Sequence, residues 1–373
     1  MKIARLATVA IASALLAATG PAAAQPKELR FGCYVPLTGQ LAIFGRSMKN
    51  GFEMAIDDFA KTAQAKGVKF SIRCEDDQGR ADDGINIARK FVEDASILAV
   101  FGSWSSTVTL AAGPIYNQGK LVNLAPVSSH PDVTKIGPYV YRQSITQPQE
   151  GEVNGAYLKA LGVKTMAMIG IPNDYGKANI HFTKTNFEKN GGKVVFEEFV
   201  RMDAQDFRQT LQKALQPDPD MLYFGGFAPQ TALMLKQLRQ MGSKKPVYLS
   251  AANESPDLVR LAGVDAVEGV RHAIEYSPVI GPKMADFFQR YQARFGAPPD
   301  PFAGNSYNSA TMMMEIVTKQ VPNVTRDSIQ KALDDVRVYD GIFGPIAYDP
   351  VTREWQFKFY RGVVEGGKAR IVQ

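Results

Sequence analysis

Cysteine, histidine and tryptophan are scarce in this 373-residue chain, which contains two, three and two of them. The histidines, His130, His181 and His272, are scattered and show no metal-ligand spacing. The chain also lacks a G-x-S-x-G elbow, a Walker-type phosphate loop and a C-x-x-C pair. We therefore predict no metal, no cofactor and no catalytic residue, and a protein that is not an enzyme.

A hydrolytic enzyme is the alternative to this prediction, since serine becomes a nucleophile when a base lies beside it. That base would have to adjoin Ser105 or Ser128, and His130 is two residues after Ser128. The position directly before Pro131 is more simply explained by a turn. The pattern therefore favours a structural loop.

Charge of one sign is not concentrated anywhere, and basic residues do not alternate with aromatic ones. The net charge is +6, of which Lys2 and Arg5 contribute two. Spread over a chain of this length, that excess is too weak to indicate nucleic acid or anionic lipid as a partner.

Long apolar runs are absent except at the N-terminus. There Lys2 and Arg5 accompany the apolar or small residues 6–18, and Ala22–Ala24 forms an A-x-A cleavage site. The run is shorter than the ~20 residues that span a bilayer. It predicts a cleaved signal peptide over residues 1–24, an exported mature chain from about Gln25, and neither membrane insertion nor a membrane-tethered receptor ectodomain.

Both cysteines lie in alternating apolar runs, Cys33 after Leu29 and Phe31, and Cys74 after Phe70 and Ile72. On adjacent strands the two sulfurs could face each other, and an oxidising compartment would favour a disulfide. Opposed residues on parallel strands fit disulfide geometry poorly, so two buried thiols are the alternative. The sequence leaves both open.

Strands and helices alternate along most of the chain. The strand expected at 29–36 is followed by a helix with Phe52, Ala55, Ile56 and Phe59 on one face. Repetition of this unit predicts an α/β protein with a doubly wound parallel sheet. A second series begins after Arg142, and no linker rich in Gly, Ser or Pro precedes it. Two lobes joined by short crossings are therefore expected.

Two serine-rich loops follow neighbouring strands. Trp104, Ser105 and Ser106 come after the strand expected at 97–100, and Ser128 and Ser129 come after that at 121–125. Loops at the carboxyl ends of parallel strands face one crevice, and a helix N-terminus offers free N–H groups to a carboxylate. The pattern predicts an anion pocket without a fixed cation. The alternative is that these serines merely cap helices.

Taken together, these and other segments make the mature chain resemble the periplasmic leucine/isoleucine/valine-binding proteins, the solute receptors of ABC importers for hydrophobic amino acids. The matching segments are 35–39, 44–45, Gly51, 55–56, 102–106, 125–134, 174–176, 223–227, 262–263, 268–269 and 344–345. The resemblance implies the type I periplasmic-binding-protein fold, with two doubly wound lobes and three crossover strands near 142–145, 274–278 and 339–344. The N-terminal lobe would comprise 25–144 plus 276–342, and the C-terminal lobe 145–275 plus 343–373.

The resemblance also implies a ligand site between the lobes. Ser105, Ser106, Ser128 and Ser129 would hold a carboxylate. Aromatic side chains would contact the rest of the solute: Phe44, Tyr175, Phe227 and Phe302, with Trp104 added because it lies inside a serine loop. In the family an acidic residue after the strand ending near Ser250 pairs with the ligand ammonium. Here either Asn253 or Glu254 would occupy that place.

The function implied is a periplasmic receptor that closes on a small carboxylate-bearing solute and delivers it to membrane permease subunits. The leading solute is a branched-chain or other hydrophobic amino acid. An aromatic carboxylate, benzoate-like or cinnamate-like, is the alternative, because the site is rich in aromatics and its acidic residue is unassigned.

Overall fold

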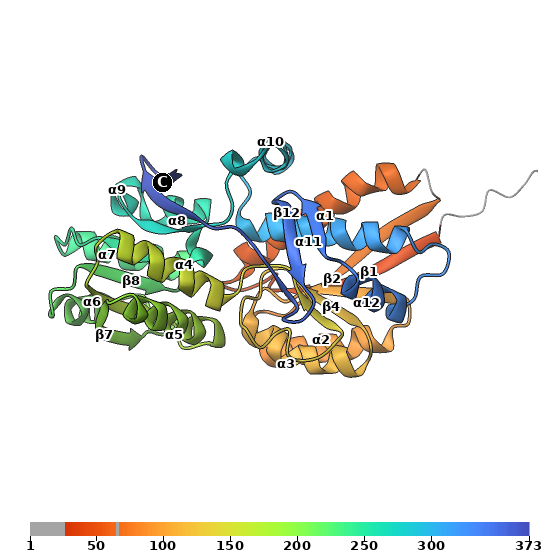
Figure 1. Cartoon of the computed structure of the whole chain (residues 1–373), viewed down its shortest axis with the longest axis horizontal. Helices are drawn as coiled ribbons and strands as arrows, with labels where there is room; N and C mark the ends of the chain where they lie inside the picture. Colours follow the sequence, from red (N-terminus) through yellow and green to blue (C-terminus); the bar gives the residue numbers. More distant parts are fainter. Residues whose placement is uncertain (1–26, 65–66, 373) are drawn as a thin grey trace, which may run out of the picture.

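The computed structural model describes residues 27–64 and 67–372. The predicted signal peptide, 1–24, lies outside the described residues. Two lobes lie side by side along the long axis of the molecule, the C-terminal lobe mostly green and the N-terminal lobe orange and blue (Figure 1). None of the helices in the described residues has the length and hydropathy of a membrane span.

A parallel five-stranded sheet, in the order β2-β1-β3-β4-β5, forms the centre of the N-terminal lobe. Its elements are β1 (Lys27–Val35), α1 (Ala42–Gln64), β2 (Val68–Asp76), α2 (Ala81–Glu93), β3 (Ile97–Gly102), α3 (Ser106–Gln118), β4 (Val122–Ala125) and β5 (Val140–Arg142), with α10 (Pro282–Phe295), α11 (Pro301–Thr318) and α12 (Arg326–Asp334) added later in the chain.

Helices cover both faces of this sheet. Because side chains alternate along a strand, Phe31 and Cys33 of β1 face the cluster formed with α1 and α11, whereas Tyr34 faces α2 and α3. The predicted stripe of α1 is buried at Phe52 and Ala55. The doubly wound arrangement is therefore confirmed.

The cysteines of this lobe form a disulfide. Cys33 on β1 lies directly opposite Cys74 on β2, and their Cα atoms are 4.3 Å apart. Of the two alternatives left open by the sequence, the structure has the bonded one.

The C-terminal lobe contains a seven-stranded sheet in the order β15-β14-β10-β9-β8-β6-β7. Pairs among β6 to β10 are parallel, whereas β14 pairs antiparallel with β10 and β15. Its elements are α4 (Gln147–Ala160), β6 (Thr165–Gly170), α5 (Asp174–Lys189), β7 (Lys193–Phe199), α6 (Arg208–Leu215), β8 (Met221–Gly225), α7 (Ala228–Gln240), β9 (Val247–Leu249), η1 (Ala251–Asn253), α8 (Pro256–Ala262), α9 (Val264–Val267), β10 (Arg271–Ile274), β14 (Tyr360–Glu365) and β15 (Lys368–Val372).

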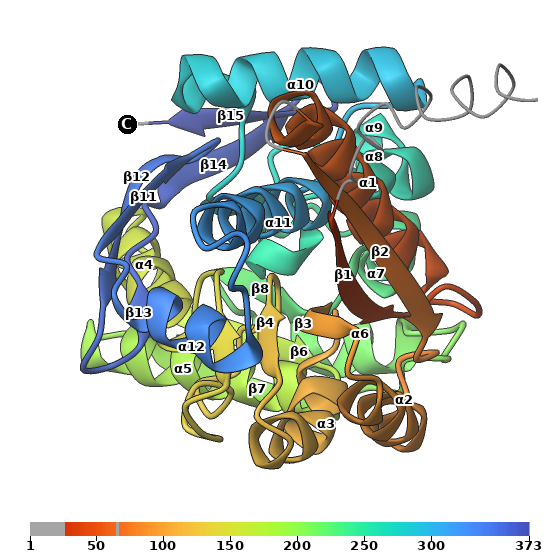
Figure 2. The ribbon, with the colours of Figure 1, turned by 90° about the vertical axis from the view of Figure 1, so that its right-hand side faces the viewer.

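The chain leaves the N-terminal sheet after β5 and the C-terminal sheet after β10, where η2 (Pro278–Ile280) follows. It then forms a separate three-stranded sheet of β11 (Val338–Gly341), β12 (Gly344–Asp349) and β13 (Glu354–Trp355). Figure 2 shows β11 and β12 beside α11.

This small sheet differs from the predicted lobe boundary after Ile342. Ile346, Tyr348 and Trp355 belong to the hydrophobic cluster that contains β1 and α11, and Glu354 pairs with the fully buried Arg142. The chain therefore stays against the N-terminal lobe through Trp355 and rejoins the C-terminal sheet only at β14, downstream of the crossing predicted at 339–344.

Candidate functional site

Aromatic side chains from both lobes meet in one cluster. Phe44 of α1 stacks on Trp104 with ring centroids 4.6 Å apart, and Phe302 of α11 lies 5.2 Å from Phe44. From the other lobe, Phe227 lies 4.6 Å from Trp104 and 5.0 Å from Tyr175. Every aromatic residue proposed from the sequence is therefore part of this cluster, and the lobes are closed on each other around it.

A cavity of ≈ 40 Å³ lies next to this cluster. It has room for only a few water molecules, so a larger solute requires the lobes or the aromatic side chains to move apart. Residues of both lobes line it, and none of them is Lys, Arg or His. The lining residues are Val127, Ser129, Ser144, Ile145, Glu150, Tyr175, Ala251, Ala252, Glu275, Pro301, Phe302 and Asn305.

The serines of the two loops take different positions. Ser129 lines the cavity, and within the described chain its hydroxyl makes no hydrogen bond. Ser128 instead joins the two loops, because its Oγ donates to the Ser103 carbonyl at 2.8 Å and lies 2.7 Å from Thr109 Oγ1.

The start of α3 keeps free polar groups. Ser105 precedes the first helical residue and its side chain makes no capping bond, Ser106 begins the helix, and the buried Thr107 hydroxyl has no partner among the described residues. Ser105 and Ser106 are buried but do not line the cavity. Their role toward a ligand stays a prediction.

Asn253 and Glu254 do not line this cavity. The short helix η1 turns the Asn253 amide back, so that it donates to the Gly226 carbonyl at 2.9 Å and to Ser250 Oγ at 3.0 Å. Glu254 Oε2 accepts the Glu275 N–H at 3.3 Å. Both residues line a separate cavity of ≈ 590 Å³. In this stretch Ala251 and Ala252 face the cleft.

Two acids that the sequence analysis did not single out line the cleft cavity, Glu150 and Glu275. Glu150 lies in the first turn of α4, directly after a capping box of Thr146 and Gln149 whose T-x-x-Q spacing is visible in the sequence. Its Oε1 accepts the Ala251 N–H at 2.8 Å, and burial raises its pKa.

Glu275 follows β10 on the second crossover. Burial, with a smaller contribution from the Glu150 carboxyl, raises the pKa of Glu275 to about 8. An acid directly after Ala273 and Ile274, at the crossover expected near 274–278, is a signal visible in the sequence. The resemblance points instead to the segment after Ser250, so Glu275 is not among the predicted site residues.

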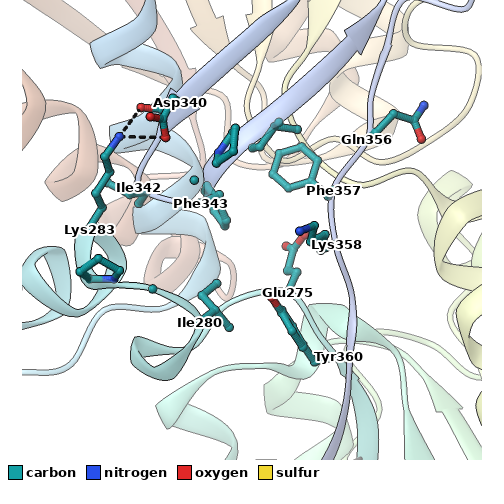
Figure 3. A pocket seen from close by; sticks show the side chains of 15 residues that line it. Glu275, Ile280, Lys283, Asp340, Ile342, Phe343, Gln356, Phe357, Lys358 and Tyr360 are labelled. Atoms are coloured by element: carbon teal, nitrogen blue, oxygen red, sulfur yellow. Dashed lines mark hydrogen bonds and ion pairs between the residues drawn. The ribbon is translucent and has the colours of Figure 1, made fainter.

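Glu275 also lines a second cavity, of ≈ 350 Å³, formed by the crossover segments. Figure 3 shows its side chain pointing into this hinge cavity, near Phe357 and Lys358, while Lys283 pairs with Asp340 at 2.8 Å on another side. Glu275 therefore stands in the wall between the cleft cavity and the hinge cavity.

The cleft is lined by hydroxyl, carboxyl, amide and aromatic groups that can recognise a solute. In the described part of the chain, no group of three or more His, Cys, Asp or Glu side chains is placed to hold a metal ion. His130 Nδ1 accepts the Asp132 N–H at 3.2 Å, the local turn expected before Pro131, and over the described ranges no hydrogen bond joins His130 to Ser105 or Ser128.

Comparison with known proteins adds independent findings. Residues 28–368 match the sequence model of a family described as periplasmic binding protein. The Leu/Ile/Val-binding protein homolog 1 of Brucella suis biovar 1 (strain 1330) is 26% identical over 324 residues, which are 86% of this chain and 86% of that protein.

Solved structures match over similar lengths. A Rhodospirillum rubrum protein assigned to branched-chain amino acid ABC transport is 34% identical, covers 92% of this chain and 100% of its own, and has a TM-score of 0.70. An ABC-transporter solute-binding protein of Rhodopseudomonas palustris BisB5, in complex with 3,4-dihydroxybenzoic acid, is 25% identical, covers 91% and 93%, and has a TM-score of 0.83.

Proposed function

Because this chain belongs to the periplasmic binding protein family and is the solute-binding receptor of an ABC transporter, we propose that its solute is a hydrophobic amino acid, most simply a branched-chain one. The receptor would be exported by its N-terminal signal, act in the periplasm without catalysis, and present the closed lobes to permease subunits. Closure would be favoured only by as much as the solute prefers the closed form.

The observation that carries this proposal is the bridging aromatic cluster beside Ser129 and the start of α3. A carboxylate held by hydroxyls and by the N–H groups of α3 needs no Lys or Arg, since such hydrogen bonds contribute about 1.5–3 kcal/mol each. An aliphatic side chain would then be buried against Phe227 and Tyr175 at roughly 25 cal/mol per Å².

An aromatic carboxylate is the second candidate. The ring cluster suits stacking on a benzoate-like solute, and the Rhodopseudomonas palustris relative holds 3,4-dihydroxybenzoic acid. Alanines, rather than an acid, face the cleft at positions 251 and 252.

A thermal-shift screen of the mature protein separates the two candidates. We expect leucine, isoleucine or valine to raise Tm, because a ligand at 100 times its Kd stabilises by about 2.7 kcal/mol. Stabilisation by benzoate or cinnamate but not by these amino acids would reject the first candidate. Replacing Ser105 and Ser129 together by Ala should weaken every carboxylate ligand, and unchanged affinity in calorimetry would place the carboxylate elsewhere.

A further inference from the structure

We propose that Glu150, Glu275 and Asn305 form a recognition site for a cationic amino group of the solute. The three residues line the cleft cavity, and no basic side chain lines it with them. This inference rests on the proposed function, and it selects the amino acid over the aromatic acid as the solute class.

Buried carboxyls without a cation are the first observation. Glu150 is 1% exposed and Glu275 6%, and neither takes part in an ion pair within the described ranges. A third carboxyl, that of Glu254, accepts the Glu275 N–H and also forms no ion pair within the described ranges. Because an isolated buried charge is costly, these groups either hold protons or meet a cation that arrives with the solute.

Unused hydrogen-bond acceptors are the second observation. Glu275 Oε2 and Asn305 Oδ1 are buried without a partner in the described chain. Asn305 Nδ2 is already committed, donating to the Pro301 carbonyl at 3.0 Å and pointing to Glu275 Oε1 at 3.5 Å. An ammonium group has three donors and no acceptor, so it matches these atoms. A second carboxylate or an apolar ring does not.

The location ties this site to closure. Glu150 belongs to α4 of the C-terminal lobe, Asn305 to α11 of the N-terminal lobe and Glu275 to the crossover between them. An amino group bound among the three would hold the lobes together. Ser129 lines the same cavity, which leaves the solute carboxylate a place on the first lobe.

The charges on the far side of Glu275 do not replace such a cation. Lys283, Lys358 and Asp340 line the hinge cavity, and Lys283 is paired with Asp340. Lys358 is exposed and forms no ion pair with Glu275 in the described structure.

Matched ligand pairs test the proposal by calorimetry on the mature protein. The probes are L-leucine with its deaminated acid 4-methylpentanoate, and L-phenylalanine with 3-phenylpropanoate. We expect each amino acid to bind at least tenfold more tightly than its deaminated partner, as the loss of one or more charge-assisted hydrogen bonds implies. This comparison uses only the unmodified protein, so it decides even where a variant fails to fold.

Variants locate the effect. Glu275→Gln and Glu150→Gln should each weaken the amino acid at least tenfold and leave the deaminated acid within about twofold. The control is Glu152→Gln, which removes an exposed carboxylate from the same helix and should change neither.

Contrary outcomes separate the two hypotheses. Equal or tighter binding of the deaminated acids, or unchanged leucine binding in Glu275→Gln and Glu150→Gln, would overturn the amino-group site while leaving a carboxylate receptor intact. Failure of all four probes and of the twenty standard amino acids would overturn the amino-acid assignment itself.

Discussion

The stability of the unliganded protein should fall as pH rises from 4.5 to about 8, between the pKa of Glu275 in the unfolded chain and its pKa in the native state. Burial keeps this carboxyl protonated in the native state up to a pKa of about 8, whereas the ordinary value is 4.5. Between those values the native state holds a proton that the unfolded chain has released. The free energy of unfolding therefore decreases with pH across this window, by at most about 1.4 kcal/mol per pH unit.

The full difference in pKa corresponds to at most roughly 5 kcal/mol. Other buried acids titrate in the same window, among them Asp77 and Asp300, whose pKa values burial raises to about 6. The Glu150 and Glu254 carboxyls lie close enough to influence Glu275, and Lys283, Lys358 and Asp340 line the hinge cavity into which it points. The effect of Glu275 must therefore be measured as a difference from a variant.

Urea unfolding of the wild type and of Glu275→Gln at pH 5, 6.5, 8 and 9 provides that difference. We expect the two proteins to be similar at pH 5 and the variant to be more stable above pH 8 by a few kcal/mol. Exposed Glu152→Gln serves as the control and should follow the wild type. Parallel profiles of wild type and Glu275→Gln would refute the reasoning, because they would mean that Glu275 is solvated or paired in the free protein.

Two further predictions concern the scaffold. Replacing Cys33 and Cys74 by Ser should lower the free energy of unfolding by about 4 kcal/mol, because the disulfide closes a loop of 41 residues. Solute affinity should stay unchanged. A loss of less than about 1 kcal/mol in urea titrations would contradict the first expectation. Glu354→Gln should destabilise the protein by about 3 kcal/mol, because the buried Arg142 guanidinium then lacks its carboxylate. A variant with the Tm of the wild type would contradict this.

Local patterns were sufficient for much of the fold. The apolar stripe of α1 and the capping box of Thr146 with Gln149 depend on neighbours within one or two helical turns. The same holds for the loops at strand ends that carry Trp104 and Phe227. Parallel strands bring such loops to one edge of a sheet, and the family resemblance assigned their aromatic residues to the solute, but neither showed how the rings pack.

Only the tertiary structure decided which acids face the cleft. Ala251 meets Glu150 across 101 residues of sequence, and Asn305 meets Glu275 across 30. The direction of the Asn253 side chain depends on the carbonyls of Gly226 and Ser250, which η1 brings near. Spacing within one segment carries no information on such contacts. The sequence alone therefore determined the architecture and the sheet edge at which we propose that the solute binds, and long-range packing determined which side chains line the cleft there.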